Sequence, residues 1–266
     1  MARDVDLWAG TIIALAVVVC FMAEQRQPLR ARVRPLGERL RTNLVMVALA
    51  ALVLRLVMVP TALATATGAE AAGLGLLRWV PLPQPAAAVA GFLLLDWSIY
   101  VWHRLNHRVP WLWRFHLVHH TDLDLDVSTA FRFHAGELLL SVGWRTLVIV
   151  TLGPSASLLM VYEVASQAAT AFHHSNWRLP PRLERGLGLV LVTPSMHGIH
   201  HSVVEAQTNS NWSVIVSGWD RLHGTWRGDP PNEALTIGLP AWREPRELGV
   251  GRLLALPFGR QRSAWP

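Results

Sequence analysis

Long runs of apolar residues alternate with polar or arginine-rich stretches along the first two thirds of this chain. About 20 residues at a rise of 1.5 Å each are needed to cross the ~30 Å hydrocarbon layer of a membrane as a helix. Three runs approach or reach this length, at residues 8–23, 44–66 and 86–102. No small-residue cleavage site is evident near the first run, so it is interpreted as a membrane anchor rather than a cleaved signal peptide.

Two shorter apolar runs follow, at residues 138–152 and 155–172. Gly153 and Pro154 lie between them, and proline cannot continue a helix. The pattern predicts a helical hairpin that enters and leaves the membrane on the same side. A short apolar segment at residues 183–192 is typical of a helix at the membrane surface, and residues 249–258 form a final amphipathic stretch.

Composition supports a membrane protein, because 52% of the residues are hydrophobic and only 16% are charged. The net charge of +6 comes from 24 basic residues, all arginine. A dense group of arginines at residues 26–41 follows the first apolar run, and such a group marks a cytoplasmic loop. Binding to anionic lipid therefore explains the positive charge more simply than binding to nucleic acid. Cys20 is the only cysteine, which excludes a disulfide framework and a thiolate metal site.

The twelve histidines all lie between His103 and His223, and the first 102 residues contain none. Residues three and four positions apart share one face of a helix. Three histidine sets with this spacing follow, namely His103 and His107; His116, His119 and His120; and His197, His200 and His201. One first-row metal accepts about six ligands, so eight or nine imidazoles predict two metals. Counting crossings from the arginine-rich loop places the first set on the cytoplasmic side.

Neutral imidazole binds iron, zinc, copper or nickel, so the ligand type alone does not name the metal. Structural zinc sites close with four ligands that commonly include thiolates, which this chain lacks. Two metals at the cytoplasmic mouth of a membrane bundle suit the oxidation of an unactivated C–H bond in a lipid. Two alternatives stay open: a zinc-dependent membrane lipid hydrolase or isomerase, and a non-catalytic metal-binding membrane protein.

Four segments of the chain are similar to a known family. They are DWSIYVWHRLNHRVPWLWRFHLVHH, STAFRFHAGE, AFHHSNWRLP and VTPSMHGIHHS, at residues 96–120, 128–137, 171–180 and 192–202. They resemble the fatty acid hydroxylase and sterol desaturase superfamily, in particular its bacterial members. The resemblance implies an all-α integral-membrane helical bundle with a cytoplasmic histidine-rich di-metal cap. It also implies a di-iron enzyme that hydroxylates or desaturates a lipid with O2 and externally supplied electrons.

The resemblance also implies roles for individual residues. The eight histidines of the three sets take ligand roles by motif, and His174 matches a further ligand of the family. His134 is either another ligand or a hydrogen-bond partner of Glu137 and a ligand imidazole, whereas His173 and His223 are not expected to bind metal. Ligating histidines usually donate their second nitrogen to a carboxylate or carbonyl. We expect that supporting role for two or three of six carboxylates. The first candidates are Asp96, Asp122, Glu137 and Glu205, and the others are Asp124 and Asp126.

The expected organisation has three parts: transmembrane helices and loops at residues 1–85, a catalytic domain at residues 86–227 and a cytoplasmic tail at residues 228–266. The sequence contains no haem-binding loop and no GxGxxG phosphate loop. Electrons are therefore expected from a separate reductase or ferredoxin, and the membrane is expected to be the bacterial inner membrane. Fatty acyl, sterol-like, carotenoid and ether lipids all remain possible substrates, and the sequence leaves open whether the product is hydroxylated or desaturated.

Overall fold

The computed structural model describes residues 2–265, with side chains from residue 8 onward. Met1, the first residue of the predicted N-terminal part, and Pro266, the last residue of the predicted tail, lie outside the described residues. The described chain is helical, and its only β-type pairings are isolated bridges. The longer helices are α1 (Ala2–Arg26), α2 (Leu36–Val53), α3 (Val59–Ala71), α5 (Gln84–Arg108), α6 (Pro110–His120), α7 (Ala135–Leu152) and α8 (Ala156–His174). The short ones are α4 (Leu76–Trp79), α9 (Pro181–Leu187), α10 (Pro194–His200), α11 (Glu205–Thr208), α12 (Gly218–Leu222), α13 (Val250–Ala255), the 3-10 turns η2 (Asn232–Ala234), η3 (Pro245–Glu247) and η4 (Leu256–Phe258), and a π-helical turn η1 (Leu54–Met58).

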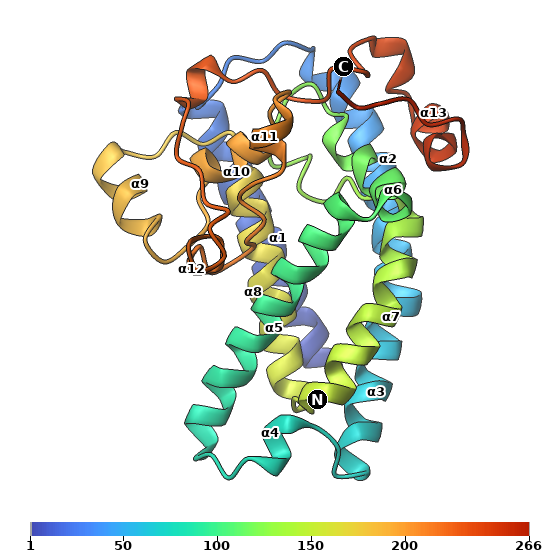
Figure 1. Ribbon diagram of the computed structural model, residues 1–266, viewed down its shortest axis with the longest axis vertical. Helices are drawn as coiled ribbons and strands as arrows, with labels where there is room; N and C mark the ends of the chain where they lie inside the picture. The colour runs from blue at the N-terminus through green and yellow to red at the C-terminus, as the bar shows by residue number, and fades with distance from the viewer. Residues whose placement is uncertain (1, 266) are drawn as a thin grey trace.

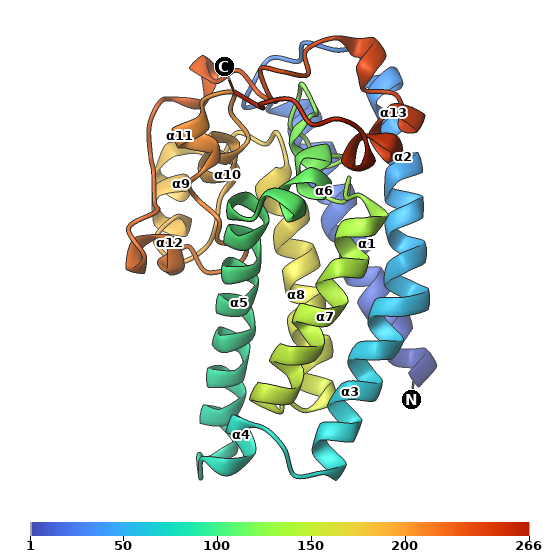
Figure 2. The same cartoon turned by 45° about the vertical axis from the view of Figure 1, so that its right-hand side comes forward.

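The long helices run side by side as a bundle. The short helices α9 to α13 gather toward one end of it, which we call the cap, whereas α4 lies at the other end (Figures 1 and 2). The turn η1 joins α2 and α3 into one continuous helix, because the residues at both junctions keep helical dihedrals. Helix α1 packs on α8, α3 packs on α7, and α5 packs on both α6 and α8.

Four helical segments are long and apolar enough to cross a membrane: Trp8–Arg26, Leu36–Trp79, Gln84–Arg108 and Ala135–Leu152. They include the three runs predicted from the sequence and the first arm of the predicted hairpin. The expectation of an all-α integral-membrane bundle is confirmed. The predicted surface helix at residues 183–192 is shorter than expected, because α9 ends at Leu187 and the chain turns at Gly188.

Helices α7 and α8 form the predicted hairpin. Gly153 ends α7 in the left-handed conformation at φ 66°, which glycine adopts without the steric cost of a side chain. A Cβ at this position would lie 2.4 Å from the Leu74 carbonyl oxygen, so the turn also packs tightly against the loop after α3. Ser155 then begins α8, its hydroxyl accepting the Leu158 N–H. Both arms reach the cap end of the bundle (Figure 2).

Buried charged side chains attach the cap to the membrane helices. Arg39 of α2 donates two hydrogen bonds to Asp122, at 2.9 and 2.8 Å, and one to Asp126 at 2.6 Å. At the end of α1, the Glu24 carboxylate accepts the backbone N–H groups of Val127 and Asn176. These contacts hold the loops after α6 and α8, the two helices that carry four of the predicted ligand histidines.

Candidate metal centre

The histidines meet where four helices converge beneath the cap. His103 and His107 lie in the last turns of α5, and α6 follows after Val109 alone, whose extended backbone turns the chain. Pro110 suits the first position of α6, since the N–H that proline lacks has no partner there. The two helices therefore face each other with their histidines turned inward. Helices α8 and α10 supply the remaining rings.

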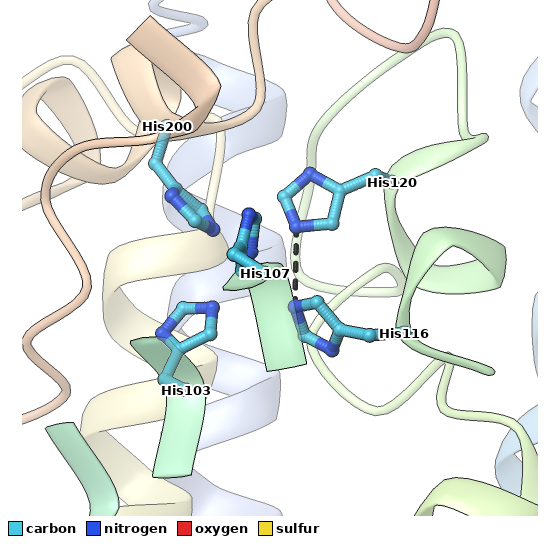
Figure 3. Close-up of side chains that lie close together, drawn as sticks. All are labelled: His103, His107, His116, His120 and His200. Atoms are coloured by element: carbon cyan, nitrogen blue, oxygen red, sulfur yellow. Dashed lines mark hydrogen bonds between the residues drawn. The ribbon is translucent and has the colours of Figure 1, made fainter. Parts of the chain in front are cut away.

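The nine histidines predicted as ligands form two groups, each with one ring nitrogen per residue within 4.8 Å of the others. The five-histidine cluster contains His103, His107, His116, His120 and His200, and Figure 3 shows these rings pointing toward one another. The four-histidine cluster contains His119, His174, His197 and His201. The clusters adjoin, since the His120 and His201 rings stack with centroids 4.4 Å apart.

Several Nε2 atoms approach one another closely. The His120 and His116 Nε2 atoms lie 3.2 Å apart, and His174 Nε2 lies 3.0 Å from both His119 Nε2 and His197 Nε2. Nitrogens that share one metal ion at about 2.1 Å lie roughly 3.0–3.4 Å from each other. The observed spacing therefore fits a common ion better than a set of direct hydrogen bonds between rings.

Hydrogen bonds between Nδ1 and backbone carbonyls fix the orientation of three of the nine rings. His103 Nδ1 lies 2.9 Å from the Trp212 carbonyl oxygen, and His174 Nδ1 lies 2.9 Å from the Thr170 carbonyl oxygen. His200 Nδ1 lies 2.8 Å from the Ser210 carbonyl oxygen. A neutral ring that donates from Nδ1 presents a lone pair at Nε2, so these contacts turn lone pairs toward the interior of the clusters.

The electrostatic setting keeps five of the clustered histidines neutral. Burial, reinforced by the neighbouring imidazoles, lowers the pKa of His119, His120, His197 and His201 well below its ordinary value, and burial lowers the pKa of His200 to about 3. Buried ring nitrogens without a hydrogen-bond partner include both nitrogens of His107 and Nε2 of His200. Neutral, convergent and unpartnered imidazoles fit two first-row metal ions.

The four carboxylates predicted to support the ligands lie in different settings. Glu137, in the first turn of α7, accepts a 2.8 Å contact from His116 Nδ1. Asp96 accepts hydrogen bonds from the backbone N–H groups of Ile215 and Val216 and from the Trp219 indole. Its link to the ligand histidines is therefore indirect, because it holds the segment whose Trp212 carbonyl contacts His103.

Asp122 and Glu205 contact no ligand imidazole. Burial acts to raise the pKa of Asp122, but the charges of Arg39 and Arg132 outweigh it and hold that pKa well below its usual range. The Asp122 carboxylate therefore remains charged and fixes the loop after α6. Glu205 begins α11, and its side chain is exposed.

The other three histidines lie outside both clusters. His134 Nδ1 accepts the Gly136 N–H at the start of α7, and its Nε2 lies 3.2 Å from the Leu254 carbonyl oxygen. His173 contacts the Val214 carbonyl through Nδ1, and its ring centroid lies 4.2 Å from that of His197. His223 is exposed and accepts a hydrogen bond from the Trp97 indole.

A cavity of about 470 Å³ extends from the clusters into the membrane bundle. Its cap end includes histidines of both clusters, among them His103, His116, His119, His174 and His197. One wall is apolar and comes from α1, α2 and η1, with Ile13, Val17, Val47, Ala50, Leu54 and Met58. The opposite wall, from α7 and α8, is more polar. An elongated lipid chain would fit between these walls with one carbon beside the histidines.

Two residues that line this cavity were not identified from the sequence. Asn106 lies between two ligand histidines on α5, is 2% exposed, and its Oδ1 has no hydrogen-bond partner. Arg145 lines the cavity from within the membrane-spanning helix α7. A sequence signal existed for Arg145, because a charged residue inside an apolar run is costly and commonly functional. Asn106 gave no such signal.

These features define a membrane protein with two adjoining, buried histidine clusters, consistent with a di-metal site, at the end of a cavity in the helical bundle. Comparison with known families agrees, since the sequence model described as fatty acid hydroxylase matches residues 88–225. The chain belongs to the fatty acid hydroxylase family. No solved structure matches the chain.

Characterised relatives include three lipid-oxidising proteins. The ornithine lipid hydroxylase OlsE of Rhizobium tropici is 30% identical over 67% of this chain and 52% of its own length. Cholesterol 25-hydroxylase of Rattus norvegicus is 30% identical over 55% of this chain and 48% of its own length. Human alkylglycerol monooxygenase is 28% identical over 60% of this chain and 34% of its own length. The chain thus spans about half the length of the first relatives it matches.

Proposed function

We propose that this protein is an O2-dependent di-iron lipid hydroxylase. The observation that carries the proposal is the cavity, because a single space with one apolar wall leads from the membrane bundle to histidines of both clusters. The names of the relatives favour hydroxylation over desaturation, since all three are hydroxylases or monooxygenases. Their names also cover an ornithine lipid, a sterol and an ether lipid, which supports a lipid substrate without selecting its class.

Nine histidines, His103, His107, His116, His119, His120, His174, His197, His200 and His201, would hold the two iron ions in this proposal. The ions supply the oxidising power that an unactivated C–H bond requires, with O2 as co-substrate and electrons from a separate reductase or ferredoxin. The protein's own contribution is positional. Glu137 orients the His116 ring, and the apolar wall excludes water and holds the lipid so that one carbon lies beside the clusters.

The proposed site faces the cytoplasm of a bacterial inner membrane. The loop between α1 and α2 contains Arg30, Arg32 and Arg34 and lies at the cap end of the bundle, whereas the loops and short helix at residues 72–83 contain only Arg78. Arginine enrichment marks the cytoplasmic side of a membrane protein. A soluble electron donor would then have direct access to the cap.

Metal analysis with labelled O2 tests the proposal. Protein purified anaerobically without chelators is expected to contain about two irons per chain, and its lipid product is expected to carry label from isotopically labelled O2. His119→Ala and His200→Ala should each lose this activity and bind about one iron instead of two, while His223→Ala, which alters an exposed histidine, should keep full activity and both irons. Zinc alone, with turnover that needs neither O2 nor reductant, would contradict the proposal and favour a hydrolase or isomerase. Full activity in either ligand variant would contradict the ligand assignment.

A further inference from the structure

The wall of the cavity formed by α7 and α8 carries a stripe of polar side chains. Ser141 and Arg145 lie four residues apart on α7, and Ser166, Gln167 and Thr170 lie on the facing part of α8. Residues three and four apart share one side of a helix, so each set forms a continuous line along the cavity. The apolar wall from α1, α2 and η1 lies opposite. The cavity is therefore amphipathic across its width, which suits an amphiphile better than a plain hydrocarbon.

Among the residues whose side chains the structure describes, Arg145 is the one arginine that lines this cavity. Its Nη1 donates to the Glu163 carboxylate on α8, and the two side chains are 21% and 20% exposed. A guanidinium group has five N–H donors in a fixed fork, so one carboxylate contact leaves donors for a ligand. The ion pair also leaves no net charge at this position. The preferred ligand is therefore a neutral acceptor, such as a hydroxyl or an ester or amide carbonyl, because a second anion would lack compensation.

The position of Arg145 along α7 determines how far it lies from Glu137, the residue of this helix that contacts the five-histidine cluster. Glu137 lies eight residues earlier on the same helix and contacts His116 of the five-histidine cluster. At 1.5 Å per residue, the two α7 positions are about 12 Å apart along the helix axis. The helix thus connects a polar contact deep in the cavity to the metal-binding histidines at its end.

We propose that the Arg145–Glu163 pair binds the neutral polar group of an amphiphilic lipid and thereby determines which carbon lies beside the histidine clusters. The separation between that polar group and the oxidised carbon is then constant, because it is set by the positions of Arg145 and Glu137 on one helix. Binding by the pair does not depend on the metals, whereas the choice of carbon rests on the proposed hydroxylase function.

A binding comparison tests the pair without any metal chemistry. The dissociation constants of 1-octadecanol and octadecane, which differ by one hydroxyl, are measured with chelated full-length protein in lipid nanodiscs. The double variant Arg145→Met/Glu163→Met removes both charges together, a replacement that is often neutral or stabilising. The matched control is Glu70→Met/Arg78→Met, which removes an exposed ion pair at 3.4 Å outside the cavity.

The ratio of the octadecane to the octadecanol dissociation constant should fall about 10–100-fold in the cavity variant, the effect of losing a hydrogen bond from a charged group. It should stay unchanged in the control. A pair that serves only to join α7 and α8 would weaken both ligands equally and leave the ratio unchanged, which would overturn the proposal.

A second measurement uses only the unaltered protein and stays informative when the cavity variant fails to fold. The iron-loaded enzyme is given hexadecanol, octadecanol and eicosanol with O2 and reductant, and the oxidised carbon is located by mass spectrometry. An anchored hydroxyl keeps that carbon at a constant count from the hydroxyl end. A constant count from the methyl end would contradict the proposal. Oxidation of none of the alcohols, together with an intact binding ratio, would instead contradict the hydroxylase function alone.

Discussion

Glu137 and Glu205 offer a direct comparison between two acidic residues that follow histidine motifs. The structure places the Glu137 carboxylate 2.8 Å from His116 Nδ1 and leaves its second oxygen buried without a partner. Glu137→Leu removes the acceptor that orients this ring. A hydrogen bond involving a charged group contributes about 1.5–3 kcal/mol, which corresponds to roughly 10–100-fold in metal affinity. Glu137→Gln retains an acceptor oxygen but loses the charge, so it should lie between the wild type and the leucine variant.

Competition with a chelator of known iron affinity measures this effect. Each purified protein is titrated anaerobically, and retained iron is read by mass spectrometry at each chelator concentration. Glu205→Gln is the control, because that side chain is exposed and contacts no imidazole. Thermal unfolding of the metal-free proteins separates metal binding from stability. If Glu137→Leu retained iron as firmly as Glu205→Gln, the assigned role of Glu137 would be wrong.

Two further predictions concern the cap and the composition of the clusters. Arg39→Met leaves Asp122 buried without its main partner and should lower the free energy of unfolding, measured by chemical denaturation, by about 3–5 kcal/mol. The control Arg34→Met breaks a partly exposed ion pair and should lower it by less than about 1 kcal/mol. His174→Ala removes one of four rings in its cluster and should reduce bound iron toward one per chain, whereas His134→Ala, outside both clusters, should retain two. Equal iron content in these two histidine variants would contradict the grouping.

The helical fold and the convergence of the histidines could be predicted because both depend on local spacing. Apolar runs of sufficient length form membrane helices wherever they occur, and the i, i+3, i+4 rule places histidines on one face without knowledge of the partner helix. The hairpin followed in the same way from Gly153 and Pro154. Each of these predictions required only neighbouring residues in the sequence.

The division of nine histidines into five and four could not be predicted. His119 and His120 are adjacent in the sequence and belong to different clusters, while His200 joins rings from α5 and α6. This grouping depends on how the ends of α5, α6, α8 and α10 meet in space, which no motif encodes. The setting of Asp96 was hidden for the same reason. It lies two helical turns before His103, but the segment that carries Ile215 and Val216 passes beside it and donates to its carboxylate.

The predicted boundary between residues 85 and 86 separates sequence motifs, but the cavity and its supports extend across it. Ile13 of α1 and Ala50 of α2 supply the wall opposite the polar stripe, and Arg39 and Glu24 hold the loops that follow the histidine-bearing helices. The histidine motifs alone would therefore lack both an enclosed lipid site and the contacts that fix their loops. Because the helices that carry the clustered histidines also contribute walls of the cavity, the choice of substrate and the geometry of the proposed metal centre depend on the same packing.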